Sequence, residues 1–189
     1  MRGEWCYYGK RFSKEQCQQI IDLSNTLPSQ DGKLGTVGDS DNRTRRSTVR
    51  FIQKNDLRFH FLFRELWEMV LEANDNFFDF HISKLDYMQV AEYKETDNGE
   101  YKSHQDVFWM NDDVKYHRKL TCVVQLSDPT TYEGGNLEIY NTRHEIDIDN
   151  RRSMGTVIIF PSFYYHAVTP VTKGIRYSLT SWIDGPKWR

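Results

Sequence analysis

The 189-residue chain has few cysteines, and they are not arranged for metal or disulfide chemistry. Cys6, Cys17 and Cys122 are scattered, and no Cys-x-x-Cys pair occurs. This spacing excludes a disulfide-stapled scaffold and the common structural zinc motifs. Cys17 and Cys122 lie in apolar patterns, which predicts small core residues in a reducing compartment.

The sequence also lacks long apolar runs and an excess of one charge. Its longest apolar runs, such as Val157–Pro161, are far too short to span a bilayer, and Met1–Trp5 lacks the apolar core of a signal peptide. The 25 basic and 27 acidic residues give a net charge of -2, which provides no general attraction to nucleic acid or to anionic membranes. We therefore expect a cytoplasmic protein with neither nucleic acid nor membrane as its partner.

Apolar residues make up 38% and aromatic residues 14% of the chain, as is typical of a folded protein. Ser13 and Gln16 form a capping-box pattern that predicts a helix ending before Pro28. A polar loop is expected over 29–47, then a strand over Thr48–Ile52 and a second helix over Asp56–Asn74.

From Phe77 onward the apolar period changes from 3.6 to 2. The strands that this period predicts are Ile82–Tyr93, Lys119–Leu126, Asn136–Tyr140, His144–Ile148, Gly155–Phe160, His166–Pro170 and Ile175–Ile183. Turns are expected between them, including one at Asn150-Arg151. We predict one domain over 1–189, mainly β with flanking N-terminal helices (α+β). Residues 1–76 would supply the helical support and the loop, and 77–186 a double-stranded β-helix (jelly-roll) core.

His104-x-Asp106 is the first candidate for chemistry. Residues i and i+2 of a strand share a face, so one metal ion can contact both side chains. His166, which follows the predicted strand Gly155–Phe160 after a turn, is the best third ligand. Two histidines and one carboxylate form the facial triad of non-haem Fe(II) oxygenases. The alternative is that both histidines are structural residues at strand edges.

Arg176 follows His166 by ten positions, with a turn-like segment, Pro170–Gly174, between them. We therefore expect His166 and Arg176 on neighbouring antiparallel strands, where the guanidinium can bind a carboxylate bidentately at a fixed distance from the metal. Ser178 shares the face of Arg176, and Tyr93 lies on an earlier strand. Both could hydrogen-bond the same carboxylate. A surface ion pair for Arg176 and structural roles for Tyr93 and Ser178 are the alternatives.

These residues occur in an order and at spacings that resemble the Fe(II)/2-oxoglutarate-dependent oxygenases of the prolyl-hydroxylase branch. Over roughly residues 80 to 186 the C-terminal part is most similar to the PKHD-type hydroxylases of bacteria. The matching segments are Tyr93, Gly99-x-Tyr101-x-x-His104-x-Asp106, Glu133-Gly134-Gly135-x-Leu137, Phe160-Pro161, His166-x-Val168-x-Pro170-Val171-x-x-Gly174-x-Arg176-x-Ser178 and Trp182-Ile183.

The resemblance implies Fe(II) bound by His104, Asp106 and His166, with 2-oxoglutarate bound by Arg176, Tyr93 and Ser178. It also implies O2 as co-substrate and ascorbate as a reductant. The implied reaction hydroxylates a substrate C–H and releases succinate and CO2. A prolyl residue of a peptide or protein is the first expectation for the substrate. The alternatives are a free amino acid or another small molecule, and a non-catalytic metal- or ligand-binding jelly roll.

Substrate contacts are harder to locate, because the first 75 residues match no motif of the family. An arginine cluster in and just after the polar loop could be a mobile segment that contacts an acidic or peptide substrate, or simply a solvated face; its members are Arg43, Arg45, Arg46 and Arg50. The aromatic residues beside the ligands are either pocket walls or core residues, namely Trp109, Tyr164 and Tyr165. Trp182 is expected in the core beneath the site, with lining the site as the alternative. Gly134-Gly135 is expected as a tight turn with positive φ.

Overall fold

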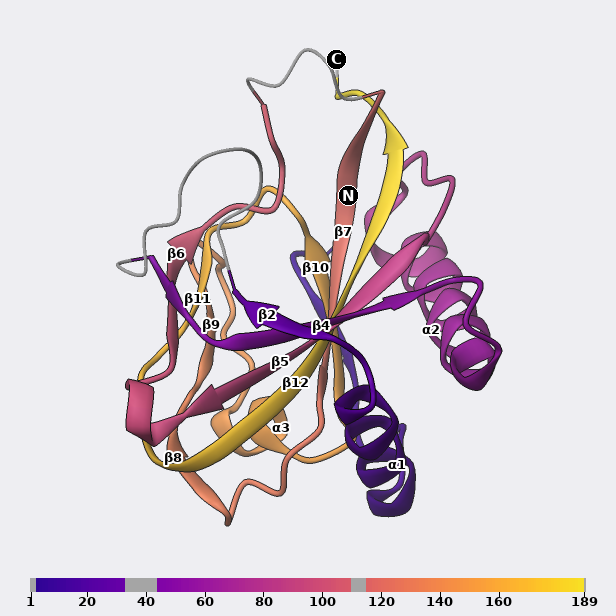
Figure 1. Cartoon of the computed structure of the whole chain (residues 1–189). Helices are drawn as coiled ribbons and strands as arrows, with labels where there is room; N and C mark the ends of the chain where they lie inside the picture. Colours follow the sequence, from indigo (N-terminus) through magenta and orange to yellow (C-terminus); the bar gives the residue numbers. More distant parts are fainter. Residues whose placement is uncertain (1–2, 33–43, 110–114, 189) are drawn as a thin grey trace.

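The computed structural model describes residues 3–32, 44–109 and 115–188. Two β-sheets face each other, and two helices cover the outer face of the larger one (Figure 1). Within the described residues, no helix combines the length and apolar character needed to cross a membrane.

The larger sheet has eight strands in the order β1-β10-β7-β12-β5-β4-β2, with β8 paired to β12. Its strands are β1 (Cys6–Tyr8), β10 (Val157–Pro161), β7 (Tyr116–Gln125), β12 (Val171–Pro186), β5 (Tyr87–Lys94), β4 (Thr48–Gln53), β2 (Ser29–Asp31) and β8 (Tyr132–Gly134). The smaller sheet has the order β3-β6-β11-β9, with β3 (Arg45–Arg46), β6 (Glu100–His104), β11 (His166–Val168) and β9 (Leu137–Ile139).

The alternation of side chains along each strand divides the larger sheet into two faces. Its outer face packs on the helices and supplies the main core, which includes Val90, Leu120, Cys122, Val124 and Leu179. The residues between them in sequence point toward the smaller sheet, among them Ala91, Tyr93 and Val123. The inner face therefore lies between the two sheets.

The helices follow the predicted pattern. Helix α1 (Lys14–Asn25) begins at the Ser13 cap, and both hydrogen bonds of the predicted capping box are present. The second predicted helix is divided into a 3-10 turn, η1 (Leu57–Phe59), helix α2 (His60–Ala73) and a π turn, η2 (Asn74–Phe78). Another 3-10 turn, η3 (Glu95–Asp97), precedes β6.

Most predicted strands are present, but their bounds differ. Strand β5 begins at Tyr87 rather than at Ile82, and β11 ends at Val168. The strand predicted over His144–Ile148 is wrong, because Asp147 caps a short helix, α3 (Ile148–Arg152). Of that alternating stretch only Ile146 is buried, so the pattern did not correspond to a buried face. The turn predicted at Asn150-Arg151 lies inside the same helix.

Two further expectations are corrected. His166 and Arg176 do not lie on neighbouring strands, because β11 belongs to the smaller sheet and β12 to the larger. Val171–Gly174, taken for a turn, pairs with β8 as the beginning of β12. The predicted loop over 29–47 carries strands β2 and β3 at its two ends, and its centre, 33–43, lies outside the described residues.

Candidate active site

Three predicted ligands meet between the sheets. His104 is the last residue of β6, and His166 is the first residue of β11, directly opposite it in the antiparallel register. Asp106 lies just beyond the end of β6 and not on the strand, and its backbone N–H donates to the carbonyl of Ser162. One ligand atom from each residue can be chosen so that all three lie within 4.8 Å of one another.

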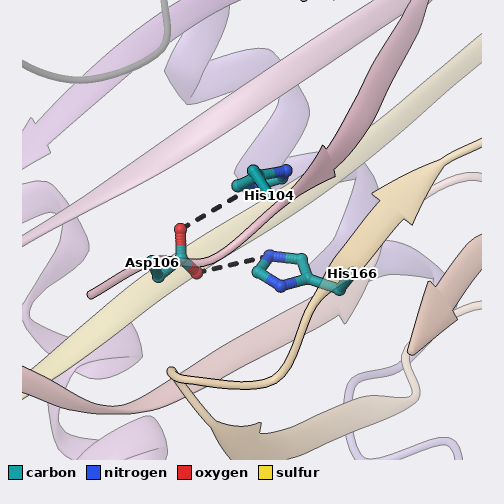
Figure 2. Close-up of side chains that lie close together, drawn as sticks. All are labelled: His104, Asp106 and His166. Atoms are coloured by element: carbon teal, nitrogen blue, oxygen red, sulfur yellow. Dashed lines mark ion pairs between the residues drawn. The ribbon is translucent and has the colours of Figure 1, made fainter. Parts of the chain in front are cut away.

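The two imidazoles are oriented with their Nε2 atoms toward the carboxylate (Figure 2). His104 Nε2 lies 3.7 Å from Asp106 Oδ1, and His166 Nε2 lies 3.4 Å from Asp106 Oδ2. The Nδ1 atoms lie 2.8 Å and 3.0 Å from the backbone carbonyls of Lys102 and Tyr164. Because a carbonyl only accepts, Nδ1 carries the proton, and in a neutral ring Nε2 is the lone-pair donor.

The electrostatics of the cluster favour a cation at its centre. Burial, together with the neighbouring His166, lowers the pKa of His104 to about 3, so its ring is neutral at physiological pH. Burial alone would raise the pKa of Asp106, but the adjacent His166 and His104 hold it well below its ordinary value. A neutral imidazole and a carboxylate that point acceptor atoms at one another are stabilised by a metal ion between them. The donor set therefore fits a metal such as Fe(II).

Neighbouring side chains hold the carboxylate in place. Thr121 Oγ1 donates to Asp106 Oδ2 at 2.7 Å, and Arg118 Nη1 lies 3.8 Å from Asp106 Oδ1. The guanidinium of Arg118 is itself stacked 4.0 Å from the ring centroid of Trp182 and donates to the hydroxyl of Tyr87. Such outer contacts fix the direction of a metal ligand.

The same cavity contains Arg176, which is 1% exposed. Its Nη2 donates to Gln125 Oε1 at 2.9 Å, its Nη1 lies 3.3 Å from Ser178 Oγ, and its Cζ lies 5.4 Å from the centroid of the Tyr93 ring. Among the residues that the structure describes, no carboxylate lies within 4.0 Å of the guanidinium. A buried charge is costly without a counter-ion. This arrangement therefore fits an anionic ligand that enters the cavity.

The predicted arginine cluster is divided by the structure. Arg45 is buried and lines the cavity, where it donates to Gln89 and Ser47 at 2.8 Å each. Its Cζ lies 4.4 Å from the ring centroid of Tyr101, which stacks on His104 at 3.6 Å. Arg46 does not line the cavity, and it forms an ion pair with the half-buried carboxylate of Glu100 at 2.9 Å. Arg43 lies outside the described residues.

The aromatic residues beside the ligands, expected as pocket walls or as core residues, mostly lie outside the cavity. Neither Trp109 nor Tyr164 lines the cavity. Trp109 is 46% exposed and donates to Gln105, while the ring of Tyr164 packs against Phe163. Trp182, expected beneath the site, lines the cavity instead. The two tyrosines that do line the cavity are Tyr93 and Tyr101.

Sequence reasoning missed three polar residues of the site, namely Thr121, Gln125 and Gln89. Each is buried and lies on the inner face of a central strand. A signal was present, because Thr121 and Gln125 alternate with the apolar residues Leu120, Cys122, Val124 and Leu126. Polar residues at every second position of a buried strand indicate a site face, since buried polar groups need partners.

Comparison with known proteins agrees with this geometry. The family model described as the 2OG-Fe(II) oxygenase superfamily matches residues 88–184. A PKHD-type hydroxylase of Aliarcobacter butzleri is 30% identical over 178 residues, which is 91% of this chain and 74% of that protein.

Solved structures share the fold at low sequence identity. A prolyl-4-hydroxylase of Pseudomonas putida has a TM-score of 0.73 at 16% identity, covering 98% of this chain and 94% of that chain. A prolyl hydroxylase of Trichoplax adhaerens, solved with a peptide fragment of a hypoxia inducible factor, has a TM-score of 0.74 at 20% identity, covering 96% and 83%. These neighbours confirm the mainly β fold with a jelly-roll core.

The family match covers all residues that line the cavity except Arg45. The donor set fits a divalent metal, and the buried guanidinium fits a ligand with a carboxylate, which are the two requirements of this chemistry. The chain belongs to the 2OG-Fe(II) oxygenase superfamily and is a hydroxylase that uses Fe(II), 2-oxoglutarate and O2.

Proposed function

We propose that His104, Asp106 and His166 bind Fe(II), that Arg176 binds the distal carboxylate of 2-oxoglutarate, and that the substrate is a prolyl residue of a peptide or protein. The observation that carries the assignment of Arg176 is its burial without a carboxylate partner among the described residues, in the cavity that also holds the three ligands. Any carboxylate bound there gains charge-assisted hydrogen bonds that neutral neighbours cannot replace.

The chain's own residues supply position and protection. Gln125 and Ser178 orient the guanidinium of Arg176. Tyr93 lies opposite Arg176 in the strand register, and its phenol can donate a hydrogen bond to the distal carboxylate of 2-oxoglutarate. The backbone carbonyls at Lys102 and Tyr164 keep the Nε2 atoms of both histidines directed inward. With Fe(II) and O2 bound, the site supplies oxidative decarboxylation of 2-oxoglutarate to succinate and CO2, coupled to hydroxylation of the substrate.

Two aromatic walls support a prolyl substrate. Tyr101 and Trp182 line the cavity from opposite sheets, and a pyrrolidine ring is an apolar, compact group that packs well against such rings. Arg45 also lines a separate, open pocket of about 290 Å³ with Gly32 and Thr48. A peptide approaching along this open pocket would reach the cavity at Arg45. The names of the relatives, which include two prolyl hydroxylases, are consistent with this substrate.

One observation favours a second candidate, a free amino acid. Arg45 is a second buried guanidinium in the cavity, and its hydrogen-bond partners among the described residues are neutral. The free carboxylate of an amino acid would provide the counter-ion that a peptide proline lacks.

Coupled turnover tests both candidates. The purified protein is incubated with Fe(II), 2-oxoglutarate, O2 and ascorbate, and succinate and products heavier by one oxygen atom are followed by mass spectrometry. The substrates are proline-containing peptides, the same peptides with alanine in place of proline, and free amino acids. Hydroxylation of the proline peptides alone supports the proposal. Turnover restricted to free amino acids selects the second candidate.

A further inference from the structure

Gly135 lies directly against the side chain of Arg176. Its φ is +60°, and a Cβ added there would lie 2.9 Å from Arg176 Cδ and 2.9 Å from Val171 Cγ2. The preceding Gly134 differs, since its Cβ would meet the backbone carbonyl of Pro170. Gly134 is thus required by the backbone of the turn, whereas Gly135 leaves room for the aliphatic stem of the arginine.

The turn that carries Gly135 is held by one arginine of helix α3. Arg152 Nη1 donates to the carbonyl of Gly134 at 2.5 Å and to the side-chain oxygen of Asn136, and Nη2 donates to the carbonyl of Tyr132 at 3.1 Å. The guanidinium also lies 4.3 Å from the ring centroid of Tyr132. That ring would in turn contact a Cβ at Gly135, at 3.5 Å. The Arg152 side chain therefore forms hydrogen bonds with residues on both sides of Gly135.

We propose that Arg152 and Gly135 are positioning residues for Arg176. Arg152 fixes the turn over 132–136, and the turn sets where the stem of Arg176 lies. The inference rests on the proposed role of Arg176 in binding 2-oxoglutarate. Neither residue lines the cavity that contains the three metal-ligand candidates.

The contacts of Arg176 explain why the position of its aliphatic stem depends on the neighbouring turn. The head of Arg176 is held by an amide oxygen and a hydroxyl, and its Nε has no partner among the described residues. Hydrogen bonds from a guanidinium to neutral oxygens are weaker than the bidentate pair that it would form with a carboxylate. A bidentate pair requires the planar guanidinium of Arg176 to face the carboxylate. A small shift of the arginine's aliphatic stem therefore reduces the affinity for 2-oxoglutarate.

The test replaces Arg152 by methionine and uses Arg151→Met as the matched control. Arg151 is the adjacent residue of α3, and it lines a different pocket, with Trp5 and Tyr140. Binding of 2-oxoglutarate to the Mn(II)-loaded protein is measured by calorimetry without O2, so that no turnover occurs. We expect R152M to weaken 2-oxoglutarate by about tenfold and R151M to leave it unchanged. Mn(II) affinity should be the same in all three proteins.

A double-mutant cycle separates positioning from general destabilisation. In an Arg176→Ala background, R152M should cause no further loss of 2-oxoglutarate affinity, because its effect passes through Arg176. An equal tenfold loss in that background would overturn the inference. Gly135→Ala provides a second route if R152M does not fold, and it should weaken 2-oxoglutarate while sparing Mn(II).

The two proposals fail in different ways. If the wild-type protein and R176A bind 2-oxoglutarate equally well, the assignment of Arg176 itself is wrong. If R176A loses binding but R152M and G135A bind as wild type does, the positioning role alone is wrong.

Discussion

His104 and His166 are paired across two antiparallel strands, with their ring centroids 4.2 Å apart. The backbone register of β6 and β11 therefore brings together two side chains that are 62 residues apart in sequence. Asp106 completes the cluster from the segment that follows β6. Each of the three residues is buried, so the arrangement is set by the sheet and not by mobile side chains.

Asp106→Ala should abolish metal-dependent turnover without unfolding the protein. The substitution removes the only carboxylate of the metal cluster identified among the described residues, and a two-histidine site binds Fe(II) weakly. Thr121→Val, which removes the hydrogen bond to Asp106, should weaken the metal by roughly 10- to 100-fold. Metal titration and circular dichroism check both variants. Succinate formation by D106A at the wild-type rate would show that another group supplies the carboxylate.

Arg176→Ala should weaken 2-oxoglutarate by about 2–5 kcal/mol, a factor of roughly thirty to several thousand. The 2-oxoglutarate affinity of Arg176→Lys should lie between those of the wild type and Arg176→Ala, because an ammonium keeps the charge but cannot form two parallel hydrogen bonds to a carboxylate. Anaerobic titration of 2-oxoglutarate into the metal-loaded protein measures the effect. Metal affinity serves as the internal control, since residue 176 is not in the metal cluster. A wild-type binding curve for R176A would contradict the proposal that Arg176 binds the distal carboxylate of 2-oxoglutarate.

Arg45→Ala should impair substrate hydroxylation far more than Arg46→Ala. Arg45 is buried in the cavity beside Tyr101. Arg46 follows it on the opposite face of β3 and forms an ion pair with Glu100. A partly exposed pair of this kind contributes only about 0–1 kcal/mol. Uncoupled decarboxylation of 2-oxoglutarate should persist in both variants and can be measured as succinate without substrate. Equal effects of the two substitutions on hydroxylation would rule out a specific role for Arg45.

Glu92→Gln should destabilise the protein, with an effect that depends on pH. Arg50 lies 2.9 Å and Lys94 3.3 Å from the carboxylate, whose side chain is 7% exposed. Burial raises the pKa of Glu92, but hydrogen bonds from Arg50 and Tyr177 outweigh it and lower the pKa below its ordinary value of 4.5. The loss at pH 7 should be about 1.5–3 kcal/mol, as for hydrogen bonds to charged groups.

The sign of this pH dependence follows from the lowered pKa. A carboxylate with a lowered folded-state pKa stabilises fully above the unfolded pKa, and that stability is lost as the pH falls through the folded value. The difference in Tm between the wild type and E92Q should therefore be largest above pH 4.5 and shrink below it. Thermal unfolding from pH 3 to pH 7 checks this, and a difference that grows on acidification would contradict it.

The sequence alone determined the local elements and the identity of the chemical groups. Ser13 and Gln16 specified the start of α1, because a capping box depends only on residues within one turn. The 3.6 and 2 periods located the helices and most strands, since each element must present an apolar face to a core. The family motif gave the three candidate ligands and Arg176, which the structure brings into one cavity.

Only the tertiary structure decided which sheet each strand joins and which polar residues share the cavity. Arg176 and His166 lie ten positions apart, yet they line one cavity from different sheets, because strand pairing depends on contacts that are distant in sequence. The same holds for Gln125, which meets Arg176 through the pairing of β7 with β12. Arg45 and Arg46 look alike in sequence, but strand alternation and packing bury Arg45 and leave Arg46 half-buried.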